Sequence, residues 1–142
     1  MATTRKAEVV WQGNLTEGSG TIVSNTSGAL PQLPVSWASR SEEPEGRTSP
    51  EELIAAAHAS CFAMALSHEL AEAGHTAERL ETSAIVTFQP GEGIKSSELT
   101  VRATVPGISA DEFRTTAEAA KTGCPVSQAL AGIEISLDAQ LT

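Results

Sequence analysis

Positive charge is scarce in this sequence. The 142 residues include 9 lysines and arginines against 18 aspartates and glutamates, so the formal net charge is −9. The phosphates of nucleic acids and of anionic membranes would repel such a surface, which argues against nucleic acid and membrane partners. Aromatic residues are also few, at 4%, so the 40% of hydrophobic residues must build a largely aliphatic core. The length is typical of one domain, residues 1–142.

Long apolar segments and familiar ligand motifs are missing as well. No apolar stretch reaches the roughly 20 residues that cross a bilayer. The N-terminal MATTRKAEVVWQG has no long apolar segment behind its charges, unlike a secretory signal, so we expect a cytoplasmic location. The only two cysteines lie far apart, and neither CxxC nor HExxH occurs, so we expect no metal site. No glycine-rich nucleotide-binding pattern occurs either.

The order of the expected elements predicts an α+β fold with an antiparallel sheet. We expect strands at 6–13, 20–24, 35–37, 79–89, 95–105 and 133–141, with a hairpin at PGEG, 90–93. The segment 39–50 is polar and contains proline and glycine, which indicates a surface loop. Helices are expected at 50–72, at 110–122 and, briefly, after Cys124.

The helix at 50–72 has clear boundaries. Ser49 can cap its first turn, Pro50 fits the first helical position, and Gly74 is a suitable stop. From Leu53 to Leu66 the helix is apolar on nearly every side, so it must be buried on several faces. A chain of this size has little material to surround such a helix. We therefore expect a homodimer in which two subunits pack these helices together.

Cys124 precedes Pro125 at the predicted start of a short helix. Free backbone N–H groups and the positive end of the helix dipole favour a thiolate there and lower the thiol pKa. A small side chain that only fills a turn is the alternative, and for a single cysteine it is the commoner role.

Cys61 lies in the middle of AAAHASCFAMALS, residues 55–67. Burial among apolar side chains raises a thiol pKa, so Cys61 taken alone reads as inert core. To act as a nucleophile it needs a buried cation or a hydrogen-bond donor, and Arg40 or Arg47 in the preceding loop could supply a cation that stays charged when buried. A cysteine hydrolase with His58 as base is a further alternative, although three residues along one helix is poor spacing for that pair.

Two segments, SPEELIAAAHASCFAMALS at 49–67 and AKTGCPVSQAL at 120–130, resemble the OsmC/Ohr family, in its OsmC branch. VWQGNLTEGSGTI, SWASRSEEPEGRTSPEEL, VPGISADEF and IEISLDAQL extend the resemblance over essentially the whole chain. The resemblance implies antiparallel sheets wrapped around long central helices in an intertwined homodimer. It places the active sites at the subunit interface.

The same resemblance implies a thiol peroxidase that reduces organic hydroperoxides to alcohols. Cys61 corresponds to the peroxidatic cysteine, which becomes a sulfenic acid, and Cys124 to the resolving cysteine that closes an intramolecular disulfide. Arg40, with Arg47 as its rival, corresponds to the activating arginine, and Glu51 to the glutamate that orients it. No cofactor is implied. The implied electron donor is an external dithiol of the dihydrolipoyl type, free or on a lipoylated protein.

Glu51 and Cys61 are ten residues apart on one predicted helix, about 15 Å along its axis. Two side chains cannot close that distance within a straight helix. If both serve one site, Glu51 must come from the other subunit, and the same expectation extends to Arg40, whose loop leads into Glu51. A non-catalytic dimer with a redox-sensing disulfide is the main alternative to a peroxidase.

Overall fold

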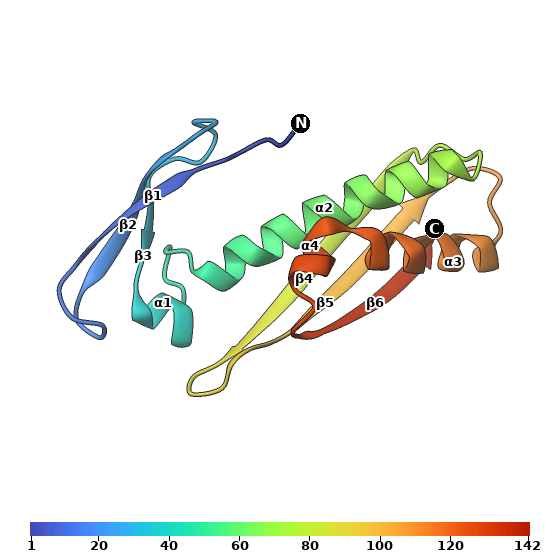
Figure 1. The fold of residues 1–142 in the computed structure, drawn as a ribbon. Helices are drawn as coiled ribbons and strands as arrows, with labels where there is room; N and C mark the ends of the chain where they lie inside the picture. The colour runs from blue at the N-terminus through green and yellow to red at the C-terminus, as the bar shows by residue number, and fades with distance from the viewer. The chain divides into compact units, whose positions relative to one another are not determined.

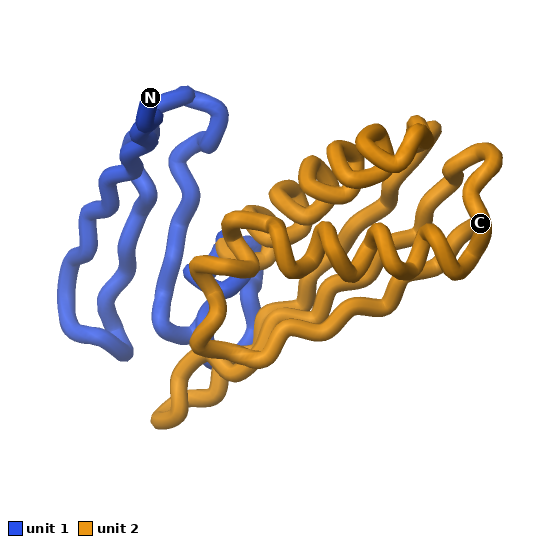
Figure 2. Tube along the Cα trace, turned by 45° about the vertical axis from the view of Figure 1, so that its right-hand side comes forward, with its two compact units in different colours: residues 1–53 blue, residues 54–142 orange.

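The computed structural model describes residues 1–142, which divide into two compact units, Met1–Leu53 and Ile54–Thr142 (Figure 2). We describe each unit by itself. The expectation of a single domain over 1–142 stays a prediction.

The first unit contains a three-stranded antiparallel sheet in the order β1-β2-β3. Its strands are β1 (Ala7–Gln12), β2 (Ser19–Asn25) and β3 (Leu33–Val35). Gly20 is paired with Trp11 on one side and with Val35 on the other. A Cβ at Gly20 would lie 2.7 Å from the indole ring of Trp11 and 2.9 Å from Cγ2 of Val35. Glycine is therefore the residue that lets these three strands pack at this point.

A short helix, α1 (Trp37–Ser41), follows β3 where the sequence predicted the end of a strand and then a loop. The Ser36 side chain accepts a hydrogen bond from the Ser39 N–H at 3.0 Å, and the Ser39 hydroxyl accepts one from the Ser36 N–H at 3.0 Å. This reciprocal capping box supports the helix. The predictions that Trp37 ends a strand and that Arg40 lies in a loop are wrong, because both belong to this helix.

The second unit packs helices on one face of a mixed sheet in the order β4-β5-β6 (Figure 1). The strands are β4 (Arg79–Gln89), β5 (Gly93–Thr104) and β6 (Glu134–Leu141). The helices are α2 (Pro50–Glu72), whose first residues belong to the first unit, α3 (Ala110–Gly123) and α4 (Pro125–Ala129). All the elements predicted from residue 50 onward are present within a few residues of their expected bounds.

The direction of β6 differs from the prediction. β4 and β5 form the expected antiparallel hairpin, whereas β6 pairs with β5 in parallel, with Leu137 opposite Leu99. The antiparallel prediction is wrong for this pair because α3 and α4 form the crossover between the two strands. A crossover of this kind returns the chain to the end of the sheet from which β5 started.

The core of the second unit lies between its helices and the sheet. Phe62, Leu66 and Leu70 recur every four residues along α2, so they share one face of that helix. This face packs with side chains of β5 and α3, namely Leu99, Val101, Ala103, Phe113, Ala117 and Ala120. These nine side chains are all at most 1% exposed.

Phe113 gives a direct test of this core. We expect Phe113→Ala to lower the free energy of unfolding by about 3–5 kcal/mol, because the change removes a fully buried ring and leaves a cavity. Urea denaturation followed by circular dichroism measures the effect. Arg114→Ala, at a neighbouring exposed position, is the control and should stay within about 0.5 kcal/mol of the parent. Equal losses in both variants would contradict the assignment of the core.

The boundaries of α2 agree with the sequence. Ser49 accepts a hydrogen bond from the Glu52 N–H at 3.2 Å, and Gly74 has a φ of 86°, a conformation that suits glycine after a helix. By length and composition, α2 is long and apolar enough to cross a membrane, contrary to the expectation that no stretch would be. A single such helix indicates little, because core helices pass the same test. Only 22% of its most apolar window is buried, and the Met64 side chain is 72% exposed.

Candidate active site

The two cysteines of the second unit lie side by side. The Sγ atoms of Cys61, in α2, and Cys124, between α3 and α4, are 2.9 Å apart, and both thiols are free. A disulfide requires about 2.05 Å between the sulfur atoms, so a small approach is enough to form the bond. The structure therefore brings together the two cysteines that the sequence analysis singled out.

Cys124 is both the C-cap residue of α3 and the N-cap residue of α4. Its N–H donates a hydrogen bond to the carbonyl of Ala120 at 2.9 Å, and Pro125 occupies the first turn of α4. The predicted N-cap position of Cys124 is confirmed. Its side chain is completely buried, whereas that of Cys61 is only partly buried. Of the two sulfurs, the one in α2 is therefore the more accessible.

The surroundings of the two thiols move their pKa values in opposite directions. Burial raises the pKa of Cys61, and its hydrogen bond with Cys124 raises it further, against a smaller lowering by the Val126 N–H. Burial also acts to raise the pKa of Cys124, but hydrogen bonds from Cys61, from the Ser127 N–H and hydroxyl, and from the Val126 N–H lower it overall. In the hydrogen bond between the two Sγ atoms, either cysteine can be the donor. The amide and hydroxyl donors around Cys124 favour the arrangement in which Cys61 keeps the proton.

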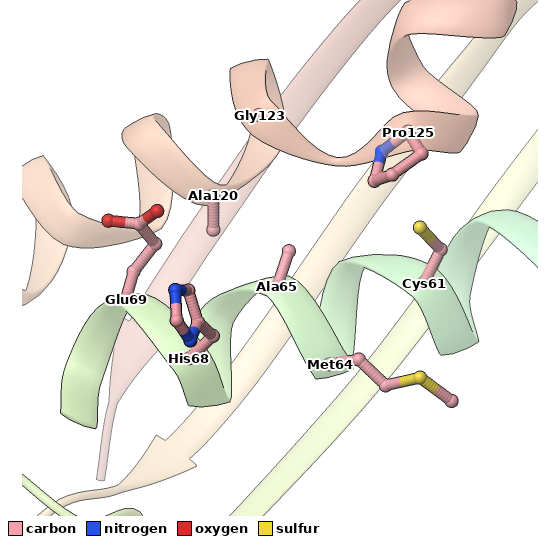
Figure 3. A pocket seen from close by; sticks show the side chains of 8 residues that line it. All are labelled: Cys61, Met64, Ala65, His68, Glu69, Ala120, Gly123 and Pro125. Carbon is pink, nitrogen blue, oxygen red and sulfur yellow. The ribbon is translucent and has the colours of Figure 1, made fainter. Parts of the chain in front are cut away.

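A cavity of about 370 Å³ opens beside Cys61, and most of its lining is apolar (Figure 3). The residues that line it are Cys61, Met64, Ala65, His68, Glu69, Ala120, Gly123 and Pro125. In Figure 3 the sulfur of Cys61 points towards Pro125, whereas Met64 points away from it. No arginine or lysine lines this cavity. A permanently charged cation that stabilises a Cys61 thiolate must therefore come from outside the lining residues, among which His68 is the one basic side chain.

His58 is completely buried in the second unit and has no free ring nitrogen. Its Nδ1 is hydrogen-bonded to the Ser97 hydroxyl at 2.6 Å, and its Nε2 to the Ser127 hydroxyl at 2.8 Å. Burial lowers the pKa of His58, which favours the neutral ring. Because both nitrogens are occupied by serines, His58 is not placed as a general base for Cys61, which argues against the cysteine hydrolase. No local pattern pointed to these serines, which lie 39 and 69 residues away along the chain.

Arg40 and Glu51 form a bidentate ion pair in the first unit. Arg40 donates from Nε to Glu51 Oε1 at 3.0 Å and from Nη2 to Oε2 at 2.9 Å. Glu51 is 6% exposed, so the pair is partly shielded from water. Such paired geometry fixes the orientation of the guanidinium group. Arg40 rather than Arg47 is thus the arginine on the Glu51 carboxylate.

Comparisons with known proteins agree with this architecture. A family described as OsmC-like protein matches residues 43–138. Peroxiredoxin OsmC of Escherichia coli is 45% identical over 140 residues, covering 96% of each chain, and so is the protein of the same name from Shigella flexneri.

Solved structures show the same fold at lower sequence identity. An OsmC-like protein from Mycoplasma pneumoniae matches with a TM-score of 0.73 at 16% identity, covering 100% of this chain and 99% of the other. An organic hydroperoxide resistance protein from Elizabethkingia anophelis matches with a TM-score of 0.68 at 24% identity, over 100% of both chains. The α+β fold expected from the resemblance is therefore confirmed.

Proposed function

Because this chain belongs to the OsmC-like protein family, we propose that it is a peroxiredoxin-like peroxidase that reduces organic hydroperoxides to alcohols. The observation that carries the proposal is the pair of free thiols 2.9 Å apart at the edge of an apolar cavity. One sulfur can react with a peroxide in that cavity, and the other is close enough to resolve the product.

The reaction has two chemical steps before the enzyme is restored. The Cys61 thiolate attacks the outer peroxide oxygen, the O–O bond breaks, and Cys61 becomes a sulfenic acid while the alkoxide takes up a proton and leaves as the alcohol. The Cys124 thiolate then forms a bond to the Cys61 sulfur, and hydroxide leaves from the sulfenic acid. The protein has gained an intramolecular disulfide, and the peroxide has gained two electrons.

The cavity supports Cys61 as the sulfur that meets the peroxide. Cys61 lines the cavity, whereas Cys124 is completely buried. Apolar walls suit the hydrocarbon part of an organic hydroperoxide and exclude water around the reacting oxygen atoms. Because burial raises the pKa of Cys61, the site needs a cation to make the thiolate at neutral pH. We assign this role to Arg40, oriented by Glu51, since that arginine is already held in a fixed geometry.

The proposed assembly is a homodimer in which each site uses residues of both subunits. Much of the apolar surface of α2 is uncovered in the single chain, which supports packing against a second copy. Glu51 and Cys61 both belong to α2, and helix geometry separates them by about 15 Å along its axis. A site that contains both side chains therefore takes Glu51 and Arg40 from the other subunit.

The proposed electron donor is a dithiol of the dihydrolipoyl type, free or carried on a lipoylated protein. It reopens the disulfide by thiol–disulfide exchange and is itself oxidised to a disulfide. We expect sustained loss of tert-butyl hydroperoxide with dihydrolipoamide as donor, measured by a colorimetric peroxide assay. Consumption of only one equivalent of peroxide per protein chain, without continued peroxide loss, would contradict the proposal and favour the redox-sensing dimer.

A mixing experiment tests the shared site. We expect Cys61→Ser and Glu51→Ala each to have little activity alone, and an equal mixture, refolded together, to regain about a quarter of the wild-type activity. Half of the dimers are then mixed, and each mixed dimer contains one complete site. The measurement is peroxide consumption before and after subunit exchange. A mixture of Cys61→Ser with Cys124→Ser is the matched control: both cysteines act from one chain, so no mixed site is complete. Absence of recovery at every mixing ratio of the first pair would contradict a shared site.

A further inference from the structure

His58 joins three elements of the second unit through its two ring nitrogens. From α2, its Nδ1 is hydrogen-bonded to the Ser97 hydroxyl of β5 at 2.6 Å, and its Nε2 to the Ser127 hydroxyl of α4 at 2.8 Å. His58 and Ser97 are 0% exposed and Ser127 is 6% exposed, so water does not compete for these bonds. The peroxidase chemistry proposed above gives none of the three residues a part.

The helix α4 has little else to hold it in place. It has only five residues, and no side chain caps its first turn by a hydrogen bond. A single helical turn is not stable without tertiary contacts. Yet no side chain of α4 belongs to the hydrophobic core of the unit, and Ser127 is the one buried residue of the helix. The hydrogen bond between Ser127 and His58 is therefore the buried attachment of α4 to α2.

This attachment lies one helical turn from the thiol pair. On α2, Cys61 follows His58 by three residues. In the facing segment, Ser127 follows Cys124 by three residues. The contact of Nε2 with Oγ at 2.8 Å and that of Sγ with Sγ at 2.9 Å thus join the same two segments. The Cys124 carbonyl accepts the Gln128 N–H at 3.0 Å, so a shift of α4 moves Cys124 with it.

We propose that His58 is a positioning residue that, by holding Ser127, docks α4 on α2 and keeps the Cys124 sulfur within bonding reach of Cys61. Neither His58 nor Ser127 exchanges a proton with the substrate. Ser97 supports the arrangement from β5, because its bond to Nδ1 fixes the orientation of the ring. This role deepens the proposed function and rests on it, since the disulfide is a product of the proposed cycle.

Docking matters because the disulfide closes only while the two sulfurs are within reach. Reacting groups that are held together behave as if they were present at very high concentration. Whenever α4 leaves α2, this advantage is lost, and a sulfenic acid on Cys61 stays open to a second peroxide. The contact of His58 with Ser127 therefore favours closure of the disulfide over further oxidation of Cys61.

The first test measures the equilibrium between the dithiol and the disulfide in glutathione buffers, without peroxide. Two electrons and two protons pass from the cysteine pair to oxidised glutathione, which becomes two molecules of the thiol. We expect Ser127→Ala to lower the equilibrium constant for disulfide formation by about tenfold, the scale of one buried hydrogen bond. Alanine is a better helix former than serine, so a weaker α4 helix is not the cause.

Variants of His58 test the other side of the contact. His58→Leu, which removes both ring nitrogens, should lower the equilibrium constant at least as far as Ser127→Ala. His58→Gln should recover part of the loss, because its amide can both donate and accept a hydrogen bond. If His58→Leu does not fold, the result for Ser127→Ala decides. An unchanged equilibrium in Ser127→Ala overturns the proposal.

Thr82→Val is the matched control. The Thr82 hydroxyl donates to the Ala59 carbonyl at 3.0 Å, so it also ties another element, β4, to α2. We expect this variant to lose stability in urea denaturation and to keep the wild-type disulfide equilibrium, because α4 is not involved. Equal shifts of the equilibrium in Thr82→Val and Ser127→Ala would overturn the proposal, since any weakening of the unit would then act alike.

Amide hydrogen exchange in the reduced protein measures the docking of α4 directly. The Gln128 N–H bonds the Cys124 carbonyl within α4, and the Phe113 N–H bonds the Ser109 carbonyl in the first turn of α3. In Ser127→Ala we expect the Gln128 N–H to exchange about tenfold faster, with the rate at Phe113 unchanged. A shifted disulfide equilibrium with unchanged exchange in α4 would overturn the docking role and assign the effect to the thiols themselves.

Both measurements need no peroxide, so they fail or succeed independently of the proposed function. If the wild-type protein does not turn over peroxide, the peroxidase proposal fails while the docking result still stands. With an active enzyme, Ser127→Ala should also lengthen the lifetime of the Cys61 sulfenic acid severalfold, as measured by trapping with dimedone. An unchanged lifetime together with a lowered equilibrium constant would overturn the link between docking and disulfide formation in the cycle.

Discussion

Cys61→Ser is expected to lower the rate of organic hydroperoxide reduction by more than about a thousandfold, the scale seen when a nucleophile is removed. A serine hydroxyl has almost no anionic form at neutral pH and cannot pass through a sulfenic acid. The measurement is the initial rate of tert-butyl hydroperoxide loss with excess dihydrolipoamide. Met64→Leu, a volume-conserving change in the same cavity, is the control and should keep most of the activity.

Cys124→Ser should separate the two chemical steps. We expect one rapid turnover, because Cys61 can still attack the peroxide, followed by a slow steady state in which the sulfenic acid accumulates. Mass spectrometry after dimedone treatment should find one adduct per chain, on Cys61. An adduct on Cys124 in the Cys61→Ser protein, together with retained activity, would reverse the roles of the two sulfurs.

Arg40→Leu is expected to have the second largest effect, with activity at neutral pH falling by about 10- to 1000-fold. An opposite charge within a few ångströms moves a pKa by roughly 1–3 units, and burial already raises the pKa of Cys61. Without the guanidinium group the thiolate forms only at higher pH. The rate of peroxide reduction by Arg40→Leu should therefore rise steeply as pH increases, and its pH–rate profile should be shifted to higher pH than that of the wild type.

Arg47→Leu is the matched control for this prediction. It removes the same charge from the same segment, but the partner of the Glu51 carboxylate is Arg40. We expect its pH profile to overlay that of the wild type. A shifted profile for Arg47→Leu, with a normal one for Arg40→Leu, would transfer the activating role to Arg47.

Local signals in the sequence were sufficient for most of the helices and for both cysteines. Ser49 with Pro50 starts α2, and Cys124 followed by Pro125 marks the start of α4, because caps depend on residues that are neighbours in the chain. The hydrogen-bond partners that act on the two thiol pKa values are supplied only by the folded chain, although the directions could be expected from the sequence. The expectation of a lowered pKa at Cys124 agrees with the structure, and so does a raised pKa at an unassisted Cys61.

The features that sequence reasoning missed depend on relations between distant segments. Alternation of apolar residues predicts β6 but carries no information on its direction, which the crossover through α3 and α4 decides. α1 has only five residues, too few for a helical period, although Ser36 and Ser39 at cap spacing were a readable sign. The serines on His58 could not be found, since nothing local links β5 and α4 to that ring.

The position of β6 at the end of the chain also sets the order in which the second unit can be completed during synthesis. β4 and β5 can pair as soon as both have left the ribosome, but β6 is made last and joins β5 only after the whole crossover has been translated. Cys124 belongs to that crossover. Newly made chains therefore pass through a period in which Cys61 is present before Cys124 has been made. An oxidant that reaches Cys61 in this period can oxidise it to the sulfinic or sulfonic acid, which disulfide formation cannot reverse.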